Sequence, residues 1–364
     1  MSRVVSTAVD MINAVREAGW ESWIVGGAVR DTLMKKEPAD VDIVSSAGEA
    51  VWQKLFGRTV RVGRRHNTFL VFSGRIPFEV TPLKGATIEE DLSRRDFSCN
   101  AAAFDSTGAL IDPFGAERAV AEKRLAAPGD PSVMFQQDKL RLLRMIRFEI
   151  CLGFKADDLL ERAFQVHAHS FFAVPERIQK ELDTIRACIS SSKLLGAYEQ
   201  RAACLPESFR FSYDPQHREF VDYPLSALAW SLMLTDGDDK KGRELGFGRR
   251  LRKMTGKAAD AANTYPWSNE ALYYYGKEAA VAAAELLPEK NGAALTERRY
   301  QLLPIKHRRE LALNGEDISL FAASDRKAVL EACERYVLQG GKNERESLLR
   351  YAKERQMEWE QRKH

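Results

Sequence analysis

The sequence predicts an α+β protein, in which a small domain built on a mixed sheet precedes a long all-helical arm. Over roughly the first 115 residues, short strand-like stretches alternate with helical ones and with turn residues. From about residue 116 onward, apolar residues recur at helical spacing and strand-like stretches largely vanish. The length of 364 residues accommodates two or three domains of ordinary size.

The N-terminal domain begins with a predicted amphipathic helix over residues 4–18, whose charged residues distinguish it from a signal peptide. A short apolar strand over residues 22–27 ends in two glycines and leads into a helix over residues 28–34. The other strand-like stretches are rich in β-branched and aromatic residues and lie at 41–44, 68–74, 77–83 and 101–115. Helices interspersed with hairpins indicate a small mixed sheet rather than a doubly wound parallel one.

The arm is predicted from segments with helical spacing of apolar residues, the clearest of which lie at 139–150, 175–189, 269–287 and 326–339. The sequence shows no repeat of fixed period. We therefore expect a succession of unlike helices rather than a solenoid of equivalent units.

Composition narrows the classes of function. The apolar fraction of 45% supports a packed core and excludes a disordered chain. The 55 basic and 52 acidic residues give a formal net charge of +3, so binding of nucleic acid requires local basic patches rather than bulk charge. No stretch approaches 18 uninterrupted apolar residues, so we expect no membrane partner and a cytoplasmic location.

Two aspartates, Asp40 and Asp42, stand two positions apart at a predicted strand, where alternate side chains share one face. Carboxylates so close together favour a divalent cation between them, and hard oxygen ligands favour Mg²⁺. Glu79 lies in another predicted strand, and three carboxylates converge if the two strands pair. Gly26 and Gly27 stand at a strand-to-helix junction, where glycines and free N–H groups admit a phosphate. This combination indicates two-metal transfer at a phosphorus centre.

Seven motifs then occur in the order found in one family of enzymes. They are GGAVRD at 26–31, DVD at 40–42, RRDFSCNA at 94–101, DPFG at 112–115, QQDKLRLLRMIRF at 136–148, PERIQKEL at 175–182 and LALNGEDI at 311–318. Together they resemble the class II tRNA nucleotidyltransferases, a family of the DNA polymerase β superfamily that includes CCA-adding enzymes and bacterial poly(A) polymerases. The resemblance covers nearly the whole chain and is strongest over residues 22–185.

The resemblance implies four parts: a nucleotidyltransferase head and an elongated helical arm made of neck, body and tail. The catalytic head spans residues 1–135, and the neck, with a base-selecting motif, spans residues 136–200. The body spans residues 201–320, and the tail, which binds tRNA, spans residues 321–364.

The resemblance also implies roles for individual residues. Asp40 and Asp42 bind the catalytic Mg²⁺ ions with Glu79 as a helper, so that the 3′-hydroxyl of an RNA end attacks the α-phosphorus and pyrophosphate leaves. The residues around the phosphates, ribose and base of the nucleotide are Gly26, Gly27, Arg30, Arg94, Arg95, Asp96, Asn100, Asp138, Arg141, Arg144 and Arg147.

Two motifs within this set carry the recognition of the nucleotide. Asp138 and Arg141 match a family motif, EDxxR, that pairs with the base edge, and their spacing predicts one shared helix face. Gln137 stands where the family has Glu. The RRD motif is associated with the ribose, since a carboxylate such as that of Asp96 can accept a hydrogen bond from the 2′-hydroxyl. Arg144 and Arg147 continue this basic face at steps of three residues, either to bind the triphosphate or RNA end or to pair with acids on neighbouring helices.

One segment of the family is short in this sequence. Between Glu79 and Arg94, complete CCA-adding enzymes insert a longer flexible loop that is needed for the terminal A, and almost no residues remain for it here. The CC-adding members of the family carry this deletion. We therefore expect template-independent addition of two CMP residues from CTP to a tRNA lacking its CCA end, with a separate A-adding enzyme acting afterwards.

Four other interpretations stay open at this stage. A complete CCA-adding enzyme that uses CTP and ATP is the nearest one. A poly(A) polymerase is disfavoured because the long basic C-terminal extension of that group is not visible. An inactive RNA-binding remnant is disfavoured by the retained acidic and basic motifs, and a nucleotidyltransferase for small molecules by the base-selecting motif and the arm.

Local charge supplies the basic patches that the net charge does not. Residues 240–257 contain eight basic residues and one acid, and a second cluster follows residue 297. Such patches contact successive phosphates or form ordinary solvated helix faces. The candidate RNA contacts are Arg249, Arg250, Arg252, Lys253, Lys306, Arg308 and Arg309.

Overall fold

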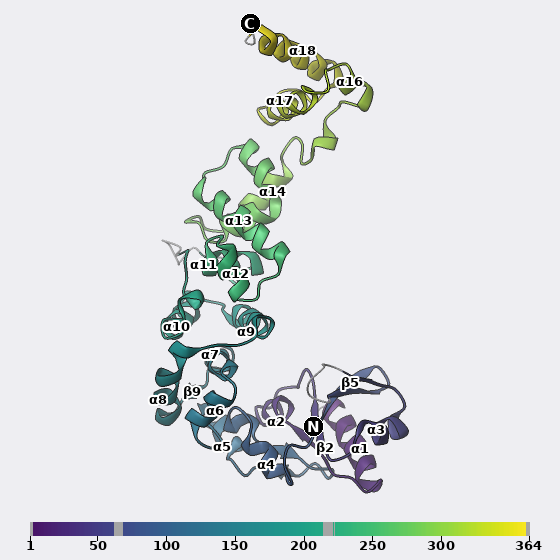
Figure 1. Cartoon of the computed structure of the whole chain (residues 1–364), viewed down its shortest axis with the longest axis vertical. Helices are drawn as coiled ribbons and strands as arrows, with labels where there is room; N and C mark the ends of the chain where they lie inside the picture. Colours follow the sequence, from purple (N-terminus) through teal and green to yellow (C-terminus); the bar gives the residue numbers. More distant parts are fainter. Residues whose placement is uncertain (1–2, 62–67, 214–220, 222, 362–364) are drawn as a thin grey trace. The chain divides into compact units, whose positions relative to one another are not determined.

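The structure is a computed structural model that describes residues 3–61, 68–213, 221 and 223–361. The chain divides into two compact units, Met1–Ala173 with Cys204–Pro206 and Val174–Ala203 with Glu207–His364. The first unit holds the sheet and its surrounding helices, and the second has helices and no strand among its described residues (Figure 1). The predicted class, a mixed-sheet head followed by helices, is confirmed. The finer division into head, neck, body and tail stays a prediction.

The sheet of the first unit has seven strands in the order β3-β4-β5-β2-β1-β6-β7. Their bounds are β1 Ser22–Val25, β2 Asp42–Ser45, β3 Thr59–Arg61, β4 Phe69–Ser73, β5 Ile76–Pro82, β6 Ala103–Phe104 and β7 Leu110–Ile111. β2 and β5 run parallel, and the other neighbouring strands run antiparallel, so the sheet is mixed. Because β2 and β5 are parallel, the chain must cross over between them.

The helices of the first unit are α1 Arg3–Glu17, α2 Gly27–Leu33, α3 Glu49–Phe56, α4 Ile88–Ser93, α5 Ala116–Ala121, α6 Pro131–Gln137, α7 Leu140–Leu152 and α8 Asp158–His167. A short parallel ladder joins β8 Arg124–Leu125 to β9 Lys155–Ala156. Asp130 caps α6 by accepting the Ser132 N–H at 2.7 Å, and Pro131 occupies the first turn. Gly153 adopts the left-handed conformation that ends α7.

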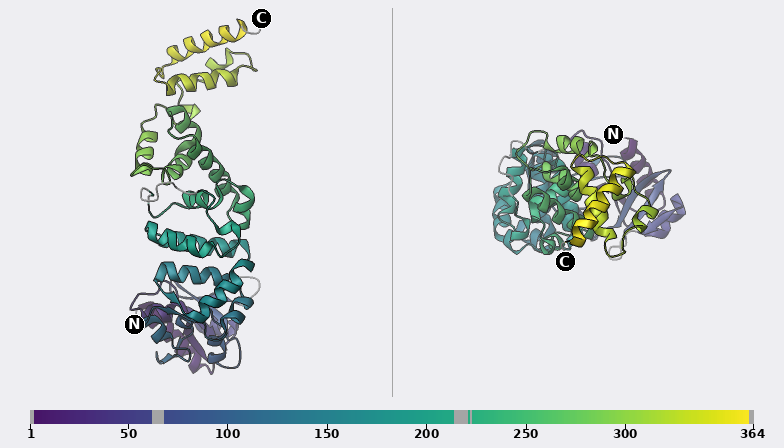
Figure 2. Two further views of the ribbon diagram at one scale, coloured as in Figure 1. Left: turned by 90° about the vertical axis from the view of Figure 1, so that its left-hand side faces the viewer. Right: turned by 90° about the horizontal axis from the view of Figure 1, so that it is seen from above.

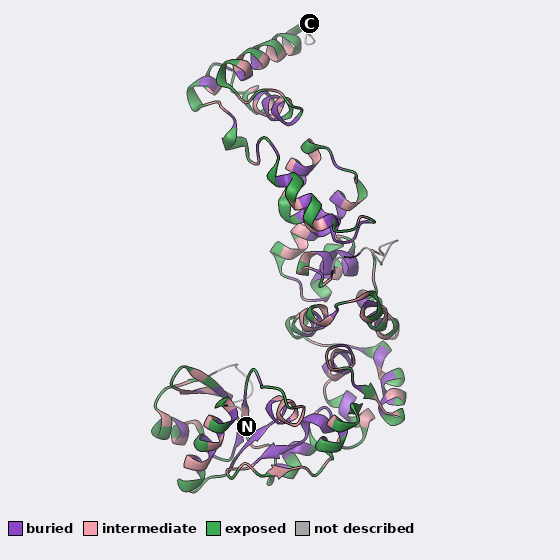
Figure 3. Ribbon diagram, turned by 180° about the vertical axis from the view of Figure 1, so that it is seen from behind, coloured by how far each residue is buried: buried purple, intermediate pink, exposed green. Residues whose placement is uncertain are grey.

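The two central strands, β1 and β2, are buried on both faces, as Figure 3 shows. Ile24 and Ile43 belong to a large apolar cluster that includes residues of α1 and α3. Trp23 and Val44, one position away in each strand, belong to a second cluster with residues of α4. Successive side chains of a strand point to opposite faces, so both clusters hold the same two strands in place.

The second unit contains α9 Pro175–Cys188, α10 Ser192–Ala202, α11 Ala227–Thr235, α12 Asp239–Glu244, α13 Arg249–Asn263, α14 Asn269–Ala284, α15 Gly292–Gln301, α16 Gly315–Ser319, α17 Arg326–Leu338 and α18 Arg345–Gln361. Near the C-terminus, α17 and α18 lie side by side (Figure 2), with the rings of Tyr336 and Tyr351 stacked at 4.4 Å.

One helix departs from its predicted form. The pattern over residues 269–287 predicts a continuous helix, but Gly276 within α14 has φ 74° and ψ 164°. This conformation is far from helical and suits glycine, so α14 is interrupted there. Separately, among the described residues we find no helix with the length and apolar character needed to cross a lipid bilayer.

Candidate active site

The loop between β1 and α2 meets the start of β2 at the centre of the sheet. The two strands pair with Val25 opposite Asp42, so Gly26 follows directly beside that aspartate. Gly26 has φ 71° and ψ −129°, a conformation that glycine adopts most readily. A Cβ at this position would lie 3.0 Å from Arg95 Nη1 and 3.7 Å from Asp42 Oδ2. The positive φ therefore favours glycine here, and a Cβ would press against the end of the Arg95 side chain.

Asp42 is the centre of the carboxylate cluster. It pairs with Glu79 across the parallel ladder of β2 and β5, which is the strand pairing on which the predicted convergence depended. Burial, followed by the charges of Glu79 and Asp40, raises the pKa of Asp42 to about 6, while Arg95 and Arg144 act in the opposite direction. Negative charge thus accumulates around Asp42, and a bound cation relieves such repulsion.

The protein side chains alone do not enclose a metal ion. Among the described residues, no three His, Cys, Asp or Glu side chains are placed to hold one. Asp42 is half-buried, whereas Asp40, which precedes the strand, and Glu79 are exposed. Two carboxylates completed by water and substrate oxygens form the kind of site that Mg²⁺ commonly occupies, so the residues present fit this ion.

Asp96 lies in the first turn after α4 and is buried. Its carboxylate accepts hydrogen bonds from the Phe97 backbone N–H at 2.9 Å, from Asn100 Nδ2 at 3.0 Å, and from Arg144 Nε and Nη2 at 2.8 and 2.5 Å. Burial alone would raise its pKa, but the charge of Arg144 and these hydrogen bonds lower it to about 2. Because the protein itself uses these acceptors, the arrangement favours a positioning role over the predicted contact with a ribose hydroxyl.

The GGAVRD motif joins the same network. Arg30 Nη1 donates to Asn100 Oδ1 at 3.0 Å, and Arg30 Nε and Nη2 donate to Asp31 Oδ1 at 2.9 and 2.6 Å. The Arg30 guanidinium lies 5.3 Å from the ring centre of Phe148, and Arg147 lies 4.9 Å from the same ring. α2, the segment after α4 and helix α7 are therefore connected through side chains that the sequence assigned to nucleotide binding.

The predicted base-selecting pair lies at the entry to α7, and its predicted geometry is wrong in one respect. Asp138 is not in a helix: its φ of −151° and ψ of 103° end α6, and α7 begins at Leu140. Its carboxylate accepts the Leu140 N–H at 3.1 Å, a local hydrogen bond that competes with continuation of the helix through Asp138. Arg141 Nη1 donates to the Met134 carbonyl at 3.2 Å and to Gln137 Oε1 at 3.4 Å.

The two arginines of the RRD motif have different surroundings. Arg94 is exposed, and its carbonyl accepts a hydrogen bond from Arg141 Nη2 at 2.5 Å. Arg95 is half-buried, and its Nη2 donates to Asp91 Oδ2 at 3.0 Å. Sequence reasoning missed Asp91, although its i,i+4 spacing from Arg95 was an available signal.

Part of the first basic patch is exposed in the second unit. Arg249 and Arg250 lie in the first turn of α13 and Lys253 lies one turn later, all exposed. Arg252 instead donates to Asp239 Oδ1 at 2.7 Å and to the Phe247 carbonyl at 2.6 Å. The helix thus offers three of the four predicted basic side chains to solvent, beside the positive end of its own dipole.

The second patch is more strongly engaged within the protein. Arg308 Nε and Nη2 donate to the two carboxylate oxygens of Glu334, each at 2.8 Å, and Tyr273 donates its hydroxyl to the same carboxylate. Arg309 is exposed and Lys306 is half-buried. Arg308 is thus exposed but already paired with an acid, so less of its charge is available to an RNA phosphate.

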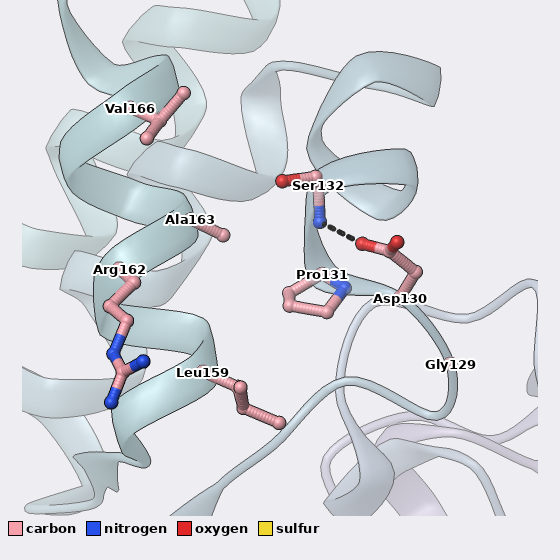
Figure 4. A pocket seen from close by; sticks show the side chains of 8 residues that line it. All are labelled: Gly129, Asp130, Pro131, Ser132, Leu159, Arg162, Ala163 and Val166. Atoms are coloured by element: carbon pink, nitrogen blue, oxygen red, sulfur yellow. Dashed lines mark hydrogen bonds between the residues drawn. The ribbon is translucent and has the colours of Figure 1, made fainter.

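A separate pocket in the first unit lies between the start of α6 and α8 (Figure 4). It is lined by Gly129, Asp130, Pro131, Ser132, Leu159, Arg162, Ala163 and Val166. None of these belongs to the predicted site, and the lining combines one acid, already used as a helix cap, with one arginine. The pocket consequently adds nothing to the chemistry around Asp42.

Comparison with known proteins finds similarity over the head and over later parts of the chain. The family of the Poly A polymerase head domain matches residues 22–126, and the family of tRNA nucleotidyltransferase domain 2 matches residues 251–352. The CCA-adding enzyme of Geobacillus sp. (strain WCH70) is 32% identical, with 93% of this chain and 94% of that protein covered. The CC-adding tRNA nucleotidyltransferase of Shouchella clausii (strain KSM-K16) is also 32% identical, with 91% and 92% covered.

Solved structures agree with the sequence comparisons. The Bacillus stearothermophilus CCA-adding enzyme in complex with CTP matches at a TM-score of 0.83 and 26% identity, with 100% of each chain covered. The similarity therefore extends over the head and over the helices that follow, and not over one shared module alone. This chain is an enzyme that belongs to the class II tRNA nucleotidyltransferases.

Proposed function

We propose that this enzyme adds two CMP residues from CTP to the 3′ end of tRNA and then stops, with Mg²⁺ as its metal. The observation that carries the CC-only part is the short connection between β5 and α4, residues 83–87. By family resemblance, a longer flexible insertion at this place is needed to readjust the pocket from C to A. A chain without it lacks the moving element for the third addition.

Hydrogen bonds hold this connection in one path. The Leu83 N–H donates to the carbonyl of the last residue of β2 at 2.9 Å, which continues the β2–β5 ladder. The Lys84 N–H donates to Asp91 Oδ1 at 3.1 Å, and the Ala86 N–H donates to Glu90 Oε2 at 2.8 Å. The connection is thus bonded to the strand before it and to the helix after it.

Gly85 fits this path where another residue would not. Its φ is 120°, and a Cβ there would collide with the Glu90 side chain. Thr87 then caps α4 by accepting the Glu90 N–H at 3.4 Å. Because these hydrogen bonds and Gly85 fix the path of the connection, they support a nucleotide pocket that accepts C and does not readjust to accept A.

The head supplies the groups for nucleotidyl transfer. Asp40 and Asp42 would hold the divalent cations, which when bound would offset the triphosphate charge and activate the 3′-hydroxyl as a nucleophile. Arg95 lies beside Asp42 and binds an anionic oxygen of the nucleotide, for which Gly26 leaves space. Glu79 faces Asp42 across the ladder and adds to the negative charge that attracts cations.

The start of α7 supplies base recognition. Asp138 offers an acceptor and Arg141 a forked donor, and together they complement the edge of cytosine. The hydrogen bond from Arg141 to the carbonyl of Arg94 connects this pair to the RRD motif, so the base and phosphate parts of the site belong to one unit.

The second unit supplies tRNA binding. The exposed Arg249, Arg250 and Lys253 stand at the N-terminal end of α13, where the helix dipole adds to their attraction for phosphate. Duplex RNA is recognised mainly by its shape and its backbone, which suits a helical surface with basic side chains. Lys306 and Arg309 extend the basic surface, with Arg308 held by Glu334.

The deciding assay supplies purified enzyme, Mg²⁺ and a tRNA lacking its CCA end, and resolves products to single nucleotides. With CTP and ATP together, we expect products that end at CC. A full CCA end overturns the CC-only part and leaves a complete CCA-adding enzyme, whereas long A tracts on unrelated RNA identify a poly(A) polymerase. Absence of any transfer identifies an inactive RNA-binding protein.

A further inference from the structure

Asp91 is a buried carboxylate to which none of these roles has been assigned. It lies in α4 and is 4% exposed. Burying a carboxylate is unfavourable unless its oxygens are hydrogen-bonded, so the partners of both oxygens matter. Here the two oxygens bind groups from different parts of the head.

One oxygen of Asp91 holds an arginine of the site, and the other holds the connection from β5. Oδ2 accepts from Arg95 Nη2 at 3.0 Å, and Oδ1 accepts from the Lys84 backbone N–H at 3.1 Å. Arg95 follows α4 in the chain, whereas Lys84 precedes it. A single side chain therefore couples the path of the connection to the orientation of the guanidinium.

The rest of the Arg95 guanidinium faces the centre of the site. Nη1 lies 3.0 Å from the position that a Cβ on Gly26 would take, and Asp42 Oδ2 lies 3.7 Å from that same position. Arg95 Nε is buried, and within the described part of the chain it has no hydrogen-bond partner. Nε shares its edge of the guanidinium with Nη2, which donates to Asp91, so Nη1 is the end that faces the site.

We propose that Asp91 is a positioning residue for nucleotidyl transfer, which acts by holding the Nη1 end of Arg95 toward an anionic oxygen of the incoming nucleotide. Through Lys84, the short connection becomes part of the same support. This role rests on the proposed CMP transfer, but it does not depend on how many CMP residues are added.

The test compares Asp91→Asn with Glu89→Gln in the full-length enzyme. The asparagine keeps an oxygen for the Lys84 N–H but turns a donor toward Arg95, whereas Glu89 is an exposed acid on the same helix and serves as the control. We measure kcat and KM for CTP in the first CMP addition, together with thermal unfolding. We expect a loss of about ten- to hundredfold in kcat/KM for D91N and a change under about twofold for E89Q.

A double-mutant cycle separates positioning from general support of the fold. If Asp91 acts through Arg95, D91N lowers the activity of an R95K enzyme little further, because the contact is already altered. Independent, multiplicative losses overturn the proposal. Lys84→Pro removes the other hydrogen bond without changing either side chain, and we expect a smaller loss in the same parameter; wild-type kinetics for both K84P and D91N also overturn it.

The proposed function and the proposed role of Asp91 are contradicted by different results. Lack of CMP transfer by the wild-type enzyme contradicts the proposed function. Normal transfer by wild type, with D91N equal to it in kcat, KM and stability, contradicts only the role of Asp91.

Discussion

Arg144 donates two hydrogen bonds to a single carboxylate oxygen of Asp96, from Nε at 2.8 Å and from Nη2 at 2.5 Å. Arg144 belongs to α7 and Asp96 to the segment after α4, so this ion pair joins two elements far apart in the sequence. The Asp96 side chain is 7% exposed, so the acidic partner of this ion pair is buried.

Replacing Arg144 by methionine should destabilise the first unit. The change leaves the Asp96 carboxylate buried without its charged partner, and because Arg144 is itself 32% exposed we expect a loss of about 2 to 3 kcal/mol. Urea unfolding at neutral pH measures it. The control is Arg118→Met, which removes an ion pair with exposed Glu122 on α5 and should change stability by less than about 1 kcal/mol. Equal effects of the two changes would contradict the importance of burial.

The same pair should appear in the acid stability of the enzyme. The pKa of Asp96 is lowered from 3.8 to about 2 in the folded state, so its contribution is fully present above pH 4 and is lost as the pH falls from about 4 to 2. We expect D96N, which does not titrate, to lose less stability than wild type over this interval, by about 2 kcal/mol. Urea unfolding at pH 5 and at pH 2.5 gives the difference, and parallel losses in both proteins would count against it.

Asp40→Ala and Asp42→Ala should each lower CMP transfer at least about a hundredfold, because each removes a carboxylate from the cation site. Binding of tRNA should change little, since the basic side chains of the second unit are untouched. The measurements are single-turnover transfer and a filter-binding titration with tRNA, with Asp10→Ala on the exposed side of α1 as the control. Substantial turnover in both variants would refute the assignment.

Chelation offers an independent test of the metal. With excess EDTA, transfer should stop and should return on addition of Mg²⁺. Unchanged transfer in EDTA would contradict the metal-dependent mechanism, and recovery with Mn²⁺ but not Mg²⁺ would change the identity of the ion.

Asp138→Ala should reduce the discrimination between CTP and UTP. The carboxylate is proposed to accept from the amino group of cytosine, an interaction that uracil lacks, so we expect the preference for CTP to fall about tenfold or more. Competition between the two nucleotides in the first addition measures the ratio. Gln136→Ala, at an exposed position on α6, is the matched control, and an unaltered ratio in D138A removes Asp138 from base selection.

A double change of Arg249 and Lys253 to glutamine should weaken tRNA binding and reduce its dependence on salt. Each lost phosphate contact lowers the slope of log K against log salt by about 0.7 to 0.9. The control is Lys54→Gln on α3, an exposed lysine of the first unit. Titrations of the enzyme with tRNA at several salt concentrations measure this slope. An unchanged slope would show that α13 is an ordinary solvated surface and not a tRNA contact.

The sequence predicts α1, α2 and most strands of the head because their patterns are local, whereas it does not predict α3 and β3. The sequence predicts both the strand that contains Asp42 and the strand that contains Glu79. In the structure the two strands pair in parallel, with Asp42 opposite Glu79. What local patterns do not show is which polar side chains become partners. The sequence suggests that Asp96 can accept a hydrogen bond from substrate. In the structure its oxygens accept hydrogen bonds from Arg144 of α7 and from Asn100.

Two errors have the same physical origin, a local conformation that overrides a spacing argument. The i,i+3 spacing of Asp138 and Arg141 implies one helix. In the structure Asp138 lies before α7, where its side chain accepts the Leu140 N–H. In α14 the apolar pattern continues across Gly276, although glycine permits the chain to depart from helical geometry there. Aspartates and glycines of this kind can interrupt a helix while the apolar pattern of the sequence continues, so the pattern alone cannot locate such breaks.

Strands β1 and β2 are packed between two apolar clusters, one on each face. Amide groups in such strands exchange with solvent only when a large part of the domain opens, whereas those of exposed loops exchange readily. Val25 and Asp42, the paired residues at the ends of these strands, thus belong to the slowest-exchanging part of the head. The polymerisation chemistry is therefore anchored where the protein moves least, and any adjustment to successive nucleotides must come from the elements placed around that anchor.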